Sequence, residues 1–185
     1  FHFSYNIRYT IHMAKITLFG MAGTGKGTIT KLLRERLGYT SFSCGDFERE
    51  VAKNRGLTLL EVDHLAKTDK RIDMEQDRVM TEFGKHNDNF IVEGRLAWYF
   101  IPDSFKVALL CSFEERTRRI AQRESKDIVI VQEETRDRED AIRQRFEEYY
   151  GLTDFENSKN FDMSIDTTHL TPEEIADQIF HALQD

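Results

Sequence analysis

The stretch from Ile16 to Thr28 constrains this chain more than any other. Four apolar or β-branched residues, 16–19, predict a buried strand that leads directly into Gly20–Thr28, a run of the form GxxxxGKGT. Apolar residues then recur at helical spacing until Gly38, a residue typical of a helix end. Since strand, glycine-rich loop and helix in this order are the context of a phosphate-binding loop, the sequence predicts a P-loop rather than an ordinary surface turn.

The residue types in this loop are suited to the phosphates of ATP. Glycines leave room for backbone amides to approach an anion, and the following helix adds the positive end of its dipole. A lysine brings a full charge to the β- and γ-phosphates, and a threonine hydroxyl is a ligand for Mg²⁺. The residues assigned to ATP are therefore Gly20, Gly23, Thr24, Gly25, Lys26, Gly27 and Thr28.

Composition limits the remaining possibilities. A chain of 185 residues is long enough for one domain with a real core. The formal net charge of −7 opposes binding to nucleic acid, so any anion site has to be local. The two cysteines, Cys44 and Cys111, have no metal-ligand spacing, and no apolar run is long enough to cross a membrane. These features favour a reduced, cytoplasmic protein without a membrane or nucleic-acid partner, and we expect a monomer.

The first residues do not fit the rest of the chain. The segment 1–12 mixes aromatic side chains with His and Arg and lacks the apolar core of a signal peptide. Met13 follows it and is a plausible natural start. We therefore interpret 1–12 as an extension or a non-native segment, and 13–185 as the single folded domain.

Strand and helix patterns alternate along the domain. The predicted strands are 15–19, 39–42, 89–93, 107–111 and 161–165, with helical patterns between them. This alternation predicts an α/β fold with a five-stranded parallel sheet covered by helices on both faces. Ligands in such folds lie beyond the carboxyl ends of the strands, so Gly20–Thr28, Ser43–Arg49 and Glu93–Arg95 should share one site.

Helix ends are marked by capping residues. Thr58 and Thr171 are each followed three residues later by Glu, and Ser112 has the same spacing to Glu115, so each predicts a helix start. Asp46 is also expected to cap a helix. A further helix is expected from about 135 to Gly151.

Arginines collect in one part of the chain. Arg119 and Arg123 share a face of the helix predicted before residue 124, and Arg138 and Arg145 share a face of the next. The segment 124–136 between them has no strong pattern and is predicted to be a mobile lid that delivers cations to a transferring phosphoryl group. The alternative is a solvated surface with ordinary ion pairs.

Two other strand ends carry candidate substrate groups. Arg49 and Arg95 are candidates to clamp the phosphate of a second substrate. Glu93 is a candidate to orient Mg²⁺-bound water. Asp77, on one helix face with Asp73, is a candidate contact for a base or ribose, although such residues are often only solvated.

Together these motifs resemble the archaeal-type cytidylate kinases, which are P-loop kinases of the nucleoside monophosphate kinase family. The resemblance rests on Gly20–Thr28, on SxGDxxR at 43–49, on VEGRLA at 92–97, on RxxRIAxRE at 116–124, and on the arginines before Tyr150-Gly151. It extends from about Lys15 to Leu183.

The resemblance implies transfer of the γ-phosphoryl group of MgATP to CMP or dCMP, giving ADP and the diphosphate. It implies that residues 45–88 form a helical monophosphate-binding region and that 124–136 form a short lid. Roles follow for the matching positions: Lys26, Arg119, Arg123, Arg138 and Arg145 in catalysis; Asp46, Arg49, Arg95 and Asp77 in substrate binding; and Thr28, Asp46 and Glu93 at Mg²⁺.

The chain departs from this family at Ile142, where a carboxylate is expected between the two arginines, and at Asp166, where the family tends to have Asn. The first departure bears on the choice of acceptor, so AMP, UMP or a non-nucleotide small molecule remains an alternative. A GTPase-like switch is disfavoured because no Asn-Lys-x-Asp run is present. A non-catalytic nucleotide-binding protein is disfavoured because the loop and the arginines are intact.

Overall fold

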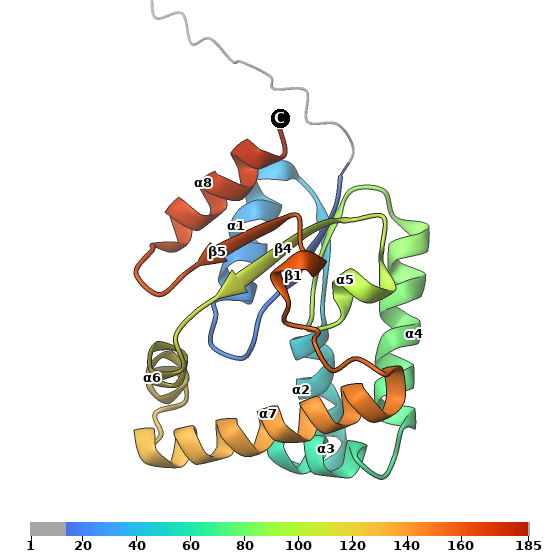
Figure 1. Ribbon diagram of the computed structural model, residues 1–185, viewed down its shortest axis with the longest axis vertical. Coiled ribbons are helices and arrows are strands. Elements are labelled where there is room, and N and C mark those ends of the chain that lie inside the picture. The colour runs from blue at the N-terminus through green and yellow to red at the C-terminus, as the bar shows by residue number, and fades with distance from the viewer. Residues whose placement is uncertain (1–13, 185) are drawn as a thin grey trace, which may run out of the picture.

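A computed structural model describes residues 14–184, so the predicted extension at 1–12 lies outside the described residues. Its centre is a parallel sheet with the strand order β2-β3-β1-β4-β5 (Figure 1). The strands are β1 Lys15–Phe19, β2 Thr40–Ser43, β3 Phe90–Glu93, β4 Phe105–Leu110 and β5 Met163–Asp166. The predicted five-stranded parallel α/β fold is confirmed: β1 has the expected bounds, and the bounds of the other strands differ from the expected ones by one or two residues.

Helices cover both faces of this sheet (Figure 1). The helices are α1 Lys26–Leu37, α2 Cys44–Arg55, α3 Leu59–Ala66, α4 Arg71–His86, α5 Ala97–Phe100, α6 Phe113–Glu124, α7 Ile128–Tyr150 and α8 Pro172–Ala182, with a 3₁₀ turn at Ser158–Asn160. The four-residue helix α5 was not expected from the sequence.

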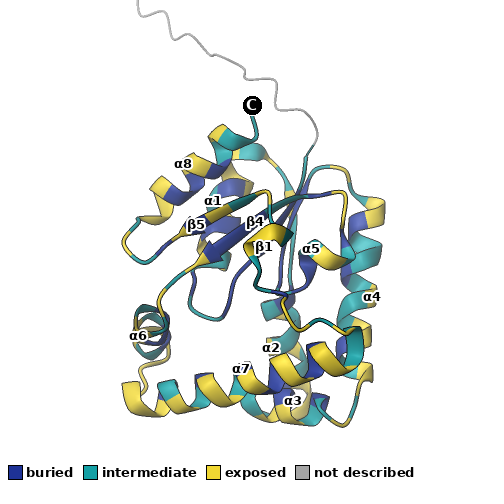
Figure 2. Ribbon diagram, viewed as in Figure 1, coloured by how far each residue is buried: buried dark blue, intermediate teal, exposed yellow. Residues whose placement is uncertain are grey.

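Side chains alternate between the two faces of the strands. On one face, Ile16 and Leu18 of β1 pack with Ile29 of α1 and Ile179 of α8. On the other face, Phe19 packs with side chains from the second half of α7 and from the loop that follows it. Figure 2 shows the result, with buried residues along the strands and exposed ones on the outer sides of the helices. The core therefore fixes the carboxyl ends of β1 and β3 side by side.

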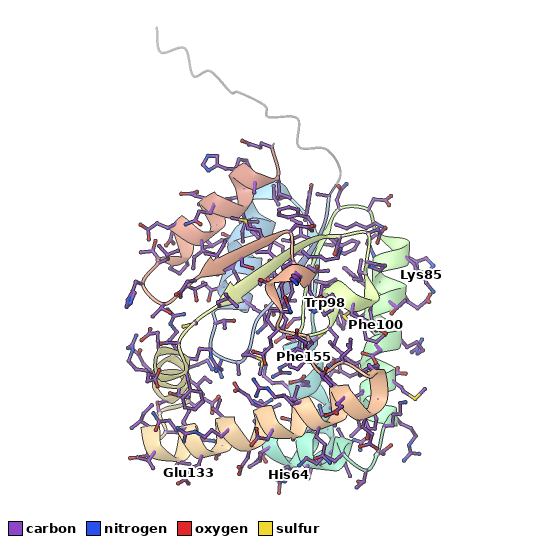
Figure 3. All side chains as sticks on the ribbon, viewed as in Figure 1. His64, Lys85, Trp98, Phe100, Glu133 and Phe155 are labelled. Atoms are coloured by element: carbon purple, nitrogen blue, oxygen red, sulfur yellow. The ribbon has the colours of Figure 1, made fainter. Side chains whose placement is uncertain are left out.

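Aromatic side chains fill the space between the sheet and α7. Phe155, labelled in Figure 3, lies with its ring centroid 5.0 Å from that of Phe146 and 6.2 Å from that of Phe19. Trp98, on α5, contacts Phe161 at 5.7 Å between centroids. Glu133 on α7 and His64 on α3 lie at the outer edge of the molecule in the same view. The inner side of α7 is thus anchored to the sheet and its outer side faces solvent.

Several predicted helix ends are confirmed. Capping boxes are present at Thr58 and at Thr171, where each hydroxyl accepts a hydrogen bond from the amide of the Glu three residues later. Ser112 accepts a bond from the Glu115 amide in the same way. The expected cap at Asp46 was wrong, because Ser43 accepts the bond from the Asp46 amide and the helix begins earlier.

The start of α7 also differs from the expectation. The helix begins at Ile128 instead of about residue 135, so most of the expected patternless lid is helical. Asp127 caps it by accepting a bond from the Val129 amide, and Ser125, with φ 53°, ends α6. Residues 128–131 are all β-branched, and only Val131 among them is buried, so no apolar stripe marked the helix in the sequence.

Candidate active site

The P-loop connects β1 to α1 and holds its lysine by backbone groups. Lys26 Nζ donates to the carbonyl oxygens of Gly20 at 2.6 Å and Met21 at 3.1 Å. Gly23 has φ +86°, and a Cβ on it would lie 2.5 Å from the carbonyl oxygen of Arg116, so only glycine fits there. Burial, followed by the positive charge of Arg95, lowers the pKa of Lys26 to about 8. The Lys26 ammonium would therefore stabilise an anion bound at this loop, and the anion would in turn favour the charged form of Lys26.

A cavity of about 420 Å³ opens beside this loop. It is bounded by the P-loop, the start of α2, the middle of α4, the end of β3, one face of α6 and the inner face of α7. Its charged lining residues are Lys26, Glu48, Arg49, Asp73, Asp77, Glu93, Arg95, Arg119, Arg123, Arg138 and Arg145. The structure thus brings the three predicted strand ends and both arginine helices to one place.

Some predicted site residues do not line this cavity. Thr24 is buried, and its hydroxyl donates to the Met21 carbonyl, while a Cβ on Gly20 would lie 2.4 Å from the Thr24 Oγ1. Their side chains therefore shape the loop. Asp46 is 76% exposed, pairs with Arg49 at 2.7 Å and lies outside the lining residues.

Two groups near the start of α1 are suited to Mg²⁺. Thr28 is exposed at the cavity. Glu93, at the end of β3, accepts a bond from the Thr30 hydroxyl at 3.4 Å, and its Oε1 lies 3.7 Å from where a Cβ on Gly27 would stand. No cluster of three or more His, Cys, Asp or Glu with metal-binding geometry occurs within residues 14–184. The oxygens present fit an ion whose other ligands are phosphates and water.

Two cavity arginines from different elements share one carboxylate. Arg95 Nη1 lies 3.0 Å from Glu48 Oε1, and Arg138 Nη2 lies 3.5 Å from Glu48 Oε2. All three side chains are largely buried, with exposed fractions of 14% for Arg95 and 17% for the other two. Arg138 is also paired with Asp63 of α3, at 2.6 Å from its Nε.

Arg145 is the most buried arginine of the site, with 5% of its side chain exposed. Its Nη1 donates to the Asp63 carbonyl at 2.9 Å and lies 3.2 Å from that residue's carboxylate. Its Nε lies 3.0 Å from Asp73 Oδ2 in a second ion pair. Burial raises the pKa of Asp73, and Arg145 opposes that rise. Two acidic residues thus hold Arg145 at the cavity wall.

The arginines of α6 have different surroundings. Arg119 pairs with Glu115 and donates to the Thr167 carbonyl at 2.8 Å, so it joins α6 to the end of β5. Arg123 is 59% exposed, and within residues 14–184 its ion-pair partner is the neighbouring Glu124. Both line the cavity. Arg123 is therefore free to move toward a ligand, whereas Arg119 starts from a fixed position.

Part of the cavity wall is formed by α4 and the end of α7. Tyr150 donates to Asp77 Oδ2 at 2.5 Å. Burial raises the pKa of Asp77 to about 6, although the bond from Tyr150 lowers it in part. Gln76 Nε2 donates to the Cys44 carbonyl at 3.2 Å. This part of the wall therefore offers amide and carboxyl groups of the kind that read a base or a ribose.

Ile142 does not face this site. It is fully buried and packs with Phe19, Met21, Phe146 and Phe155. The carboxylates that accompany Arg138 and Arg145 come instead from Asp63 on α3 and Asp73 on α4. The apolar residue at 142 thus belongs to the core and leaves the polar lining of the cavity unchanged.

Sequence reasoning missed several residues of the site. Glu48 and Gln76 line the cavity, and Asp63 holds two of its arginines. Glu139 pairs with Arg116 at 2.6 Å beneath the P-loop, where Arg116 also donates to the Ala22 carbonyl. Glu48 stands inside the run 43–49 and was within reach of the sequence argument. The others carry no local signal, because their partners lie far away in the chain.

The family model that matches this chain is described as an AAA domain and covers residues 16–144. A cytidylate kinase from Methanothermobacter thermautotrophicus is 39% identical over 158 residues, which are 85% of this chain and 98% of that protein. One from Halobacterium salinarum is 35% identical over 170 residues, or 91% of this chain and 88% of that protein.

Solved structures agree on the fold. A shikimate kinase from Acinetobacter baumannii superimposes with a TM-score of 0.61 at 17% identity, covering 92% of this chain and 93% of the other. An uncharacterized protein from Eubacterium ventriosum superimposes with a TM-score of 0.69 at 18% identity, covering 93% of this chain and 99% of the other. Among residues 14–184, no helix is both long and apolar enough to cross a membrane. With its P-loop, its arginine-lined cavity and these relatives, the chain belongs to the cytidylate kinase family of P-loop kinases.

Proposed function

We propose that this protein transfers the γ-phosphoryl group of ATP to CMP or dCMP, giving ADP and CDP or dCDP. The observation that carries the proposal is the cavity in which Lys26 of the P-loop and Glu93 meet the arginines of α2, of the end of β3, of α6 and of α7. Phosphoryl transfer needs this combination, because its transition state spreads negative charge over the transferring group. Relatives that are named cytidylate kinases support CMP as the acceptor.

In this proposal the P-loop holds ATP through the amides of 20–28 and through Lys26, whose ammonium already lies against the loop. Thr28 and Glu93 would hold Mg²⁺, Thr28 by its hydroxyl and Glu93 through water. The ion would supply charge stabilisation on the phosphate oxygens of ATP. Asp46 is not needed for this role, given its exposed pairing with Arg49.

The acceptor would bind on the opposite wall of the same cavity. Arg49 and Arg95 would hold its phosphate, a role supported by their position in the lining of the cavity. Asp77 and Gln76 of α4 would contact the base or ribose, since both line the same cavity. The helices α2, α3 and α4 together make up the proposed monophosphate-binding region 45–88.

The remaining arginines would complete the site around the transferring group. Arg138 and Arg145 reach the cavity from α7, and Arg119 and Arg123 reach it from α6. The proposed lid, 124–136, consists of the end of α6, the short link 125–127 and the first turns of α7. Its movement toward bound substrates would bring Arg123 in and exclude water.

No catalytic base is required in this scheme. The acceptor atom is a phosphate oxygen that already carries negative charge at neutral pH. It forms the new P–O bond as the bond between the γ-phosphorus and the bridging oxygen of ATP breaks, and ADP leaves. The protein therefore acts by positioning and by charge stabilisation. We also propose that the protein acts as a monomer, and its substrates favour a cytoplasmic location.

ADP formation from MgATP tests the proposal, measured with CMP, dCMP, UMP, AMP and GMP in turn. A strong signal restricted to CMP and dCMP supports it. Activity with another monophosphate would keep the mechanism and change the acceptor. Absence of acceptor-dependent ADP with all five would overturn the proposed function.

A further inference from the structure

Glu48 occupies the place between two arginines that the proposed function assigns to phosphates. Its two carboxylate oxygens contact different guanidinium groups, one of Arg95 at 3.0 Å and one of Arg138 at 3.5 Å. These arginines belong to the end of β3 and to α7, and Glu48 belongs to α2. A carboxylate that bridges two guanidinium groups through separate oxygens imitates the way a phosphate would bridge them.

The two arginines depend on Glu48 to different degrees. Arg138 keeps a second carboxylate, because Asp63 lies 2.6 Å from its Nε. Arg95 is paired with Glu48 alone among the described residues, and its Nε is buried without a hydrogen-bond partner. Arg95 therefore has donor capacity that Glu48 does not use, and an anion with more oxygens would satisfy it better.

We propose that Glu48 is an internal competitor of the acceptor's phosphate, holding Arg95 and Arg138 in the empty site and leaving them when a monophosphate binds. The inference rests on the proposed function, because it takes these arginines as the phosphate site. Glu48 then sets the affinity for the acceptor, and its return to the arginines assists release of the product.

Removal of the charge of Glu48 should strengthen binding of the monophosphate. Glu48→Gln keeps the shape of the side chain and removes one negative charge a few ångströms from the incoming dianion. At the effective dielectric constant of about 20 that suits partly buried sites, such a change corresponds to at least about a tenfold tighter binding of the monophosphate. The affinity for ATP should change much less, because its phosphates are held by the P-loop.

The test is calorimetric titration of CMP into protein saturated with a non-hydrolysable ATP analogue. Glu50→Gln is the matched control, since Glu50 is exposed on the same helix, carries the same charge and does not line the cavity. The dissociation constant for CMP should fall by at least about tenfold in Glu48→Gln and stay at the wild-type value in the control. In steady-state kinetics KM for CMP should fall while kcat does not rise.

Equal or weaker binding of CMP by Glu48→Gln would overturn the inference, because a residue that only supports the arginines would loosen the site when neutralised. Binding of inorganic phosphate is measured as a second probe under the same conditions. It tests the role of Glu48 independently of which monophosphate is the acceptor. If the wild type forms no ADP with CMP, the proposed function fails, yet phosphate should still bind more tightly to the variant. Glu48→Ala also lacks the charge and must show the same direction, even if Glu48→Gln does not fold.

Discussion

The hydroxyl of Tyr150 lies 2.5 Å from Oδ2 of Asp77 and joins the last turn of α7 to the middle of α4. Both residues line the cavity. The pair therefore links the proposed base or ribose contact to the same helix that carries Arg138 and Arg145.

This pair predicts a pH-dependent stability. Asp77 ionises near pH 3.8 in the unfolded chain, whereas burial raises its pKa to about 6 in the folded protein. An acid with a raised pKa binds its proton more tightly in the folded state, so the fold loses stability as the pH rises between these values. Relative to Asp77→Asn, the free energy of unfolding of the wild type should fall by about 1–2 kcal/mol between about pH 4 and about pH 6, a range that allows for the partial exposure of Asp77. Above about pH 6 the difference between the two proteins should stay constant.

Urea denaturation of both proteins across this range measures the difference. Tyr150→Phe serves as a second variant, because it removes the bond that favours the ionised Asp77 and should move the upper end of the window above about pH 6. A constant difference between wild type and Asp77→Asn from pH 4 to pH 6 would show that burial does not raise the pKa of Asp77.

Loss of the P-loop cation should abolish most of the activity and leave the fold intact. Lys26→Ala removes the ammonium that lies against the Gly20 and Met21 carbonyls. Turnover should fall by about a hundredfold or more, as expected for a preorganised cation at a transferring phosphoryl group. Lys31→Ala, at an exposed position on the same helix, is the control and should keep the wild-type rate. Near-normal turnover of Lys26→Ala would contradict the assignment of this loop to ATP.

Asp63 should be important for stability although it does not line the cavity. Asp63→Asn removes the buried carboxylate that faces both Arg138 and Arg145. Removing one partner of a buried ion pair typically costs about 3–5 kcal/mol of unfolding free energy. Because Arg138 keeps Glu48 and Arg145 keeps Asp73, we expect a cost toward the lower end of that range. Denaturant unfolding measures it, with the exposed Asp137→Asn on α7 as the control. A loss as small as that of the control would mean that the two arginines are solvated instead of held by Asp63.

The sequence identified the parts of this molecule whose signals are local. Local patterns of neighbouring residues predict the P-loop, the capping boxes at Thr58 and Thr171, and the five strands. These elements could therefore be predicted from the sequence. The start of α7 was missed because the β-branched run from Ile128 has no helical periodicity, and its cap at Asp127 was not recognised as one.

The pairing of the charges was beyond the reach of sequence patterns. Arg138 and Arg145 were singled out by their spacing, yet their partner Asp63 lies 75 and 82 residues away. Glu48 and Arg95 are 47 residues apart and meet only because α2 and the end of β3 approach the same cavity. Such contacts are set by the packing of helices around the sheet. Ile142 is a further example. The sequence showed an apolar residue where a carboxylate was expected, and only the structure shows that this side chain is buried in the core with Phe155.

Transfer of the labelled phosphoryl group tests the central claim most directly. The protein is incubated with Mg²⁺, CMP and ATP radiolabelled at the γ-phosphate, and the products are separated by chromatography. The account predicts that the label appears in CDP, on its β-phosphate, and that this product is absent without CMP or with Lys26→Ala. Label found only in inorganic phosphate or retained in ATP would contradict the claim that this cavity joins the two nucleotides for direct transfer.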